Sequence, residues 1–269
     1  MSHNSRIEKI DLLLSPKQAV LSHVARLVQF GSVFEYRAST SARLDSVHPL
    51  QHLSEQVERC VEETLSEEDD DKIERTLWIA LRDVGFLFFL HEYLNDLVAS
   101  RAGLLAVLSE LVDEKLGRMI DLSPRKVTSG SQDEIVLKSR FVGFTETVET
   151  LASSLYSLAA TVKNIEDKYF NGNSILFSSP RLAVNEIGEQ LERSVTVYNN
   201  LASRCPWAQP PIDLEKSRTA ASKTARATCA DLVDMARADA LNHLGDRTGA
   251  RTIARRVAGR LAGTHLQGT

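Results

Sequence analysis

The chain has 269 residues, of which 43% are hydrophobic and 25% are charged, and its formal net charge is −4. These values are ordinary for a globular protein. The sparse Gly and Pro argue against β-sandwiches and barrels, and three widely separated cysteines (Cys60, Cys205 and Cys229) argue against a disulfide framework.

The most apolar stretch, residues 77–97, is interrupted by Arg82, Asp83, Glu92 and Asp96. A spanning helix needs about 20 predominantly apolar residues, so this stretch does not predict one. The first six residues also lack the apolar core of a secretory signal. We therefore expect a cytoplasmic protein with reduced thiols and no membrane contact.

The N-terminal part predicts several helices in residues 1–121. Ser15 begins the first, with Pro16 in its first turn, and His48-Pro49 opens the second. A third helix is expected over about 71–98, with an apolar seam in four–three spacing. Arg101-Ala102-Gly103 predicts a turn before a fourth helix over about 105–119. We expect these helices to form an N-terminal bundle.

The polar stretch Ser123–Asp133 contains Ser-Gly-Ser and is the best linker candidate. A long helix is then expected from about Glu134 to Tyr169, because its apolar residues keep an unbroken heptad spacing. That seam comprises Leu137, Phe141, Phe144, Val148, Leu151, Leu155, Leu158, Val162, Ile165 and Tyr169. Asn171-Gly172-Asn173 ends it and Ser179-Pro180 starts another helix, which predicts an antiparallel hairpin over 134–205.

The heptad seam has two interpretations, a dimeric coiled coil or burial within a bundle. A two-stranded coiled coil carries opposite charges beside its seam. The flanking positions here are instead mostly small and neutral, including Thr147, Ala152, Ser154, Ala159 and Thr161. Neighbouring helices can therefore approach from both sides, which favours the bundle.

Pro206 to Pro211 breaks the chain again, and two further helices are expected over about 214–244 and 247–261. The fold class is thus all-α: a multi-helix bundle with a long antiparallel hairpin and a basic C-terminal helical appendage, residues 214–269. Residues 216–269 carry 10 Lys/Arg and 4 Asp/Glu, although the whole chain is acidic. A basic segment on an acidic chain points to an anionic partner.

The last helix carries arginines on both flanks of a narrow apolar stripe formed by Ala250, Ile253, Val257 and Leu261. This pattern suits contact with phosphate, and the candidate nucleic-acid-binding residues are Arg247, Arg251, Arg255, Arg256 and Arg260. An anionic membrane surface or an acidic protein groove would also suit it. In the alternative interpretation the helix docks by its stripe while the arginine stems extend over the protein surface.

Two resemblances to known motifs occur in this region. Leu241 to Val257 loosely resembles a helix-turn-helix, with Gly249 at the turn. Arg237 and His243 have a spacing that resembles helical ribonucleases of the HEPN type, in which Arg and His act on RNA phosphate; the other such pairs are Arg43/His48 and Arg260/His265. The number of such pairs is close to the number expected by chance.

No catalytic constellation or cofactor motif stands out. His48 and His52 have a spacing that can hold a metal, but Pro49 lies between them and no third ligand is in phase. We therefore expect no metal, no cofactor and no catalysis. The predicted function is that of a helical subunit of a protein assembly, whose basic C-terminal helices contact nucleic acid; the alternatives are a purely protein-binding scaffold and a HEPN-like ribonuclease.

Overall fold

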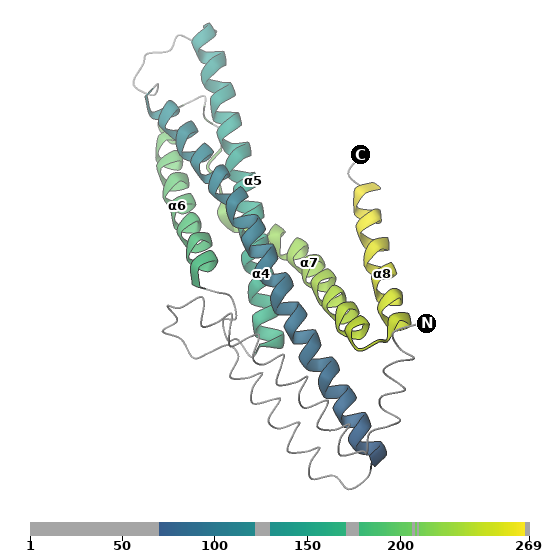
Figure 1. The fold of residues 1–269 in the computed structure, drawn as a ribbon. Coiled ribbons are helices and arrows are strands. Elements are labelled where there is room, and N and C mark those ends of the chain that lie inside the picture. Colours follow the sequence, from purple (N-terminus) through teal and green to yellow (C-terminus); the bar gives the residue numbers. More distant parts are fainter. Residues whose placement is uncertain (1–69, 122–129, 171–177, 206–207, 209, 267–269) are drawn as a thin grey trace. The chain divides into compact units, whose positions relative to one another are not determined.

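In a computed structural model of the chain, the structure describes residues 70–121, 130–170, 178–205, 208 and 210–266. These residues form helices and contain no strand, so the predicted all-α fold is confirmed (Figure 1). The helices are α4 (Asp70–Ile120), α5 (Gln132–Tyr169), α6 (Ser178–Ala202), α7 (Leu214–His243) and α8 (Arg247–Leu266). The helices predicted around Ser15 and His48, and with them Cys60, lie outside the described residues.

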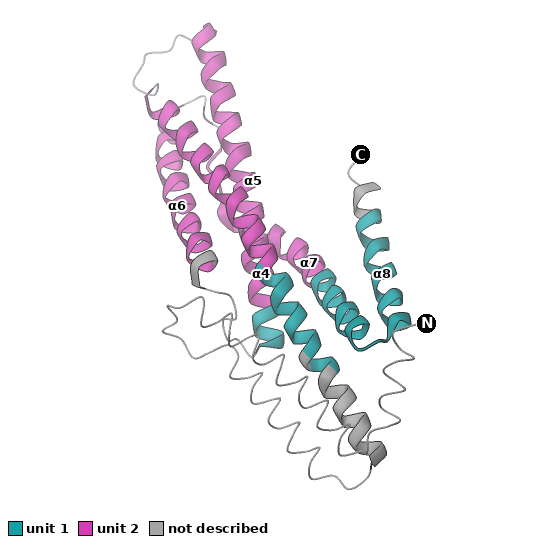
Figure 2. Ribbon diagram, in the orientation of Figure 1, with its two compact units in different colours: residues 1–95, 165–177, 230–269 teal, residues 96–164, 178–229 magenta. Residues whose placement is uncertain are grey.

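The described residues belong to two compact units (Figure 2). Within them, unit 1 comprises 70–95, 165–170 and 230–266, and unit 2 comprises 96–164, 178–205, 208 and 210–229. Each unit is therefore assembled from segments far apart in the sequence, and α4, α5 and α7 each contribute to both. The predicted division into segments 1–121, 134–205 and 214–269 stays a prediction.

The α5 seam forms the centre of unit 2. Every seam residue from Leu137 to Val162 is buried, and the flanking Thr147, Ala152 and Thr161 are buried as well. Tyr198 of α6 is fully buried and stacks on Phe144, with ring centroids 4.8 Å apart. Ser154 is half-buried and Ala159 is exposed. Burial of the seam and of three of the five flanking residues shows that α5 packs among other helices of the chain, although not at every flanking position.

The predicted antiparallel hairpin of α5 and α6 is also confirmed. Phe144 of α5 lies against Tyr198 of α6. Further along α5, Leu155 lies near Gly188, which comes earlier in α6: a methyl group added to Gly188 would be 3.7 Å from the Leu155 side chain. Residues later in α5 thus contact residues earlier in α6, so the two helices are antiparallel. The 3.7 Å distance is ordinary van der Waals contact, so the two helices lie close together at Gly188 without leaving a gap.

One predicted boundary is wrong: α4 runs without a break through Arg101-Ala102-Gly103. Gly103 is exposed, and a methyl group added there would meet no neighbouring atom within 4 Å, so nothing in the fold requires a turn at this position. A glycine inside a helix costs only about 1 kcal/mol relative to alanine. Burial of Val98, Leu105 and Val112 at seven-residue intervals provides the packing that keeps this segment helical.

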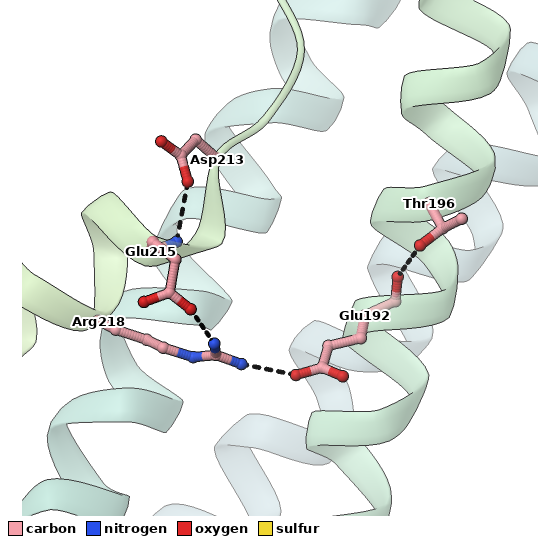
Figure 3. A network of polar contacts seen from close by, with 5 residues as sticks. All are labelled: Glu192, Thr196, Asp213, Glu215 and Arg218. Carbon is pink, nitrogen blue, oxygen red and sulfur yellow. Dashed lines mark hydrogen bonds and ion pairs between the residues drawn. The ribbon is translucent and has the colours of Figure 1, made fainter.

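The connection from α6 to α7 is held by polar contacts in unit 2. The Asn199 side chain donates to the Ile212 carbonyl and accepts from the Ile212 amide, at 3.1 and 2.9 Å. Asp213 then caps α7 by accepting from the Glu215 amide. Arg218 links α7 to α6 by binding Glu192 at 2.7 Å and also bonds Glu215 within α7 (Figure 3).

Candidate nucleic-acid interface

The candidate interface lies on α8, which follows α7 in unit 1 after a tight turn. The Asp246 amide donates to the Leu241 carbonyl at 2.9 Å, and Gly245 has a φ of 92°. A left-handed residue at this place ends a helix and favours glycine. The Asp246 carboxylate accepts from the Gly249 amide at 2.9 Å and so caps the start of α8.

The predicted apolar stripe of α8 is buried along its first part. Ala250 and Val257 are buried and Ile253 is half-buried, whereas 48% of Leu261 is exposed. The stripe therefore docks α8 from Ala250 to Val257, and its far end does not take part.

Arg260 joins α8 to α7 within unit 1. Its guanidinium donates to Asp231 and to Asp234, each at 2.8 Å. The hydrogen bonds to Asp234 and Asp231 hold the pKa of Arg260 above its usual range. Of the predicted phosphate-binding arginines, Arg260 is thus the one that the structure engages in an intramolecular contact.

The four remaining arginines, Arg247, Arg251, Arg255 and Arg256, are exposed. None of them forms an ion pair with another described residue. Residues 247–266 contain no Asp or Glu, and the exposed positions between the arginines are Ala, Gly or Thr. We call these four residues the α8 arginine face.

The arginine face has a regular geometry. Arg247, Arg251 and Arg255 are four residues apart, which places them about 6 Å apart along the helix axis on one side of α8. Arg256 lies about 100° further round the helix from Arg255. Positive charge therefore covers much of the solvent-exposed side of α8. The residues between the arginines are small, so the guanidinium groups remain accessible.

The resemblance to a helix-turn-helix is wrong in its register. The turn lies at Gly245-Asp246, and Gly249 stands inside the first turn of α8. The reason is the cap: Asp246 supplies the helix start that the motif would place later in the chain. The residues of the arginine face nevertheless remain on one helix, as predicted.

Arg237 and His243, the pair typical of the ribonuclease alternative, both lie exposed on α7 in unit 1. Their positions differ by six residues, which places them about 120° apart around the helix. Arg237 lies over the ring of Phe86, and the ring of His243 lies 6.2 Å from that of Phe89. The ribonuclease stays an untested alternative.

The other predicted pairs involve residues outside the described part of the chain. Arg43, His48 and His52 lie there, as does the side chain of His265. Among the described residues, no group of three or more His, Cys, Asp or Glu could hold a metal ion. In that same part of the chain, every helix is too short or too polar to cross a membrane.

Comparison with known proteins identifies no relative of this chain. No family model, curated protein or solved structure matches it.

Proposed function

We propose that this protein is a non-catalytic, cytoplasmic helical subunit of an assembly and that the α8 arginine face binds nucleic acid. The observation that carries the proposal is the presence of four exposed arginines on a helix without acidic residues, beside a fifth that is paired. The cytoplasmic setting is inferred from the three widely separated cysteines in the sequence, a usage that fits a reducing compartment.

The chemistry of the arginine face favours phosphate as its ligand. A guanidinium offers five donors in a planar fork that binds phosphate oxygens in pairs. Each phosphate contact releases counterions from the nucleic acid, so affinity falls steeply as salt rises. Four such contacts predict a slope of log K against log salt of about −3 to −4.

The test is a titration of the full chain against labelled RNA and DNA at several salt concentrations. A variant with all four arginines changed to Gln should bind more weakly and have a shallower slope, by about one per contact removed. The matched control changes Arg118, Arg140, Arg193 and Arg204 to Gln. These side chains are exposed in unit 2, so the control removes the same charge from a different surface.

An equal loss in both variants would show that net charge, and not the arginine face, determines binding. Binding by neither variant nor the unchanged chain would end the proposal. The docking of α8 through Val257 and Arg260 would then favour a second candidate function, that of a protein-binding scaffold whose basic tail is held internally.

A further inference from the structure

Unit 1 contains a row of two aromatic rings with a cation at each end. The Lys168 ammonium lies 5.1 Å from the centre of the Tyr169 ring. That ring meets Phe86 edge-on, with centroids 5.4 Å apart and planes at 75°. The guanidinium of Arg237 lies over Phe86, 5.4 Å from the ring centre. We call these four residues the cation–aromatic row; they come from α5, α4 and α7.

The row differs from the aromatic cluster in the core of unit 2. Phe144 and Tyr198 have no exposed surface, whereas Phe86 and Tyr169 are only partly buried. Both cations of the row are exposed, and neither forms an ion pair with another described residue. Asp234, three residues before Arg237 on α7, is already bound by Arg260, and Asp239 is hydrogen-bonded to Tyr93.

We propose that the cation–aromatic row is a stacking surface for the bases of single-stranded nucleic acid. The proposal rests on the proposed function and names the form of nucleic acid that the protein takes. Bases stack on aromatic rings and on the guanidinium plane of Arg, and a neighbouring Lys neutralises phosphate. Partly exposed rings between two accessible cations provide both kinds of contact from one surface.

Single strands fit this surface better than duplexes do. In a duplex the base faces are stacked on each other, so only an unpaired base can stack on the Arg237 guanidinium or on the ring surface of Phe86 and Tyr169 that Arg237 and Lys168 leave uncovered. The α8 arginine face would bind phosphates of either form. The row would therefore add a contribution that depends on bases, whereas the arginine face contributes one that does not.

The experiment compares three ligands with the full chain: a single-stranded oligonucleotide of about 12 residues, an abasic strand with the same number of phosphates, and a duplex of the same sequence. The single strand should bind at least about tenfold more tightly than the abasic strand, because stacking of one base increases affinity by about this factor. Tyr169→Leu and Phe86→Leu should remove this difference and leave abasic binding unchanged. Tyr169→Phe, which keeps the ring, should preserve it.

A second measurement uses the unchanged protein, so that it does not depend on the folding of a variant. Photocrosslinking to a strand that carries 5-iodouracil should label peptides containing Phe86 or Tyr169. Crosslinks confined to α8 would overturn the inference.

The outcomes separate the inference from the proposed function. Equal binding of the single and abasic strands, with loss in the α8 arginine variant, would overturn the stacking surface and leave the phosphate-binding face intact. Equal weakening for all three ligands in the Leu variants would show that the row only packs helices together. A chain that binds none of the ligands would contradict both proposals.

Discussion

Arg260 of α8 binds two carboxylates of α7, Asp231 and Asp234, at 2.8 Å each. The two acids are three residues apart on α7, so one planar guanidinium reaches both. The Arg260 side chain is 38% exposed, and solvent reduces the strength of each ion pair. We expect Arg260→Gln to lower the free energy of unfolding by about 1 kcal/mol and to speed amide hydrogen exchange in α8.

The control for this prediction is Arg256→Gln, which removes an exposed arginine of the same helix that has no ion pair among the described residues. It should leave the exchange rates of α8 unchanged. Equal exchange in the two variants would show that the Arg260 contact does not hold α8 against α7.

Two glycines of α8 should respond to alanine with opposite signs. A methyl group at Gly249 would collide with the Asp246 carboxylate and lie 3.2 Å from Leu241, so Gly249→Ala should disturb the cap and lower stability by about 1 kcal/mol. Gly259 has open space around it, and Gly259→Ala should raise stability by about 0.5–1 kcal/mol through helix propensity. Thermal unfolding of both variants measures the difference, and a gain in both would show that the cap tolerates the methyl group.

The packing of α5 was predictable because the heptad spacing of its apolar residues shows which side of the helix is buried. Leu137 to Val162 repeat at heptad spacing, and small residues such as Ala152 and Thr161 mark the sides where neighbours pack. Single residues that commonly interrupt helices were less informative about where α4 ends. Gly103 predicted a break in α4, but the buried residues on either side of it outweigh the small cost of one glycine.

Ser131 carried a signal that the linker interpretation of 123–133 missed. Its hydroxyl accepts from the Glu134 amide, and Glu134 accepts from the Gly130 amide, which is close to a capping box. The Ser-x-x-Glu spacing would have placed the helix start at this serine.

The cation–aromatic row could not be predicted in this way. Phe86, Tyr169 and Arg237 are separated by more than 60 residues at each step, and no pattern within one helix brings them together. The α8 arginine face, by contrast, lies on a single helix, so its grouping follows from helical geometry alone.

Glu134 should give the protein a pH-dependent contribution to stability. Its hydrogen bonds with Lys138 and with the Gly130 amide lower the pKa of its carboxyl below the ordinary value of 4.5. A group whose folded pKa is depressed stabilises the fold above its unfolded pKa, and this contribution is lost as pH falls through the folded pKa. Stability should therefore decrease below about pH 4.5, and Glu134→Gln should remove that part of the decrease.

Urea unfolding between pH 7 and pH 3 measures this effect. Glu149→Gln is the control, because Glu149 is an exposed carboxylate on the same helix without a hydrogen bond to another described residue. Identical pH profiles for the Glu134 variant and the unchanged protein would contradict the prediction.

The aromatic contact between α5 and α6 should contribute strongly to the stability of unit 2. Tyr198 is fully buried, stacks on Phe144 at 4.8 Å and has Phe141 at 6.0 Å, so its ring fills the space between the two helices. Tyr198→Ala would leave a cavity and should cost about 3–5 kcal/mol. The adjacent Val197 is 42% exposed, and Val197→Ala should change stability by less than about 0.5 kcal/mol. Because the two positions are neighbours on α6, they share the same helix and differ mainly in burial. Similar losses in urea unfolding would mean that Tyr198 stabilises α6 locally and does not hold it to α5.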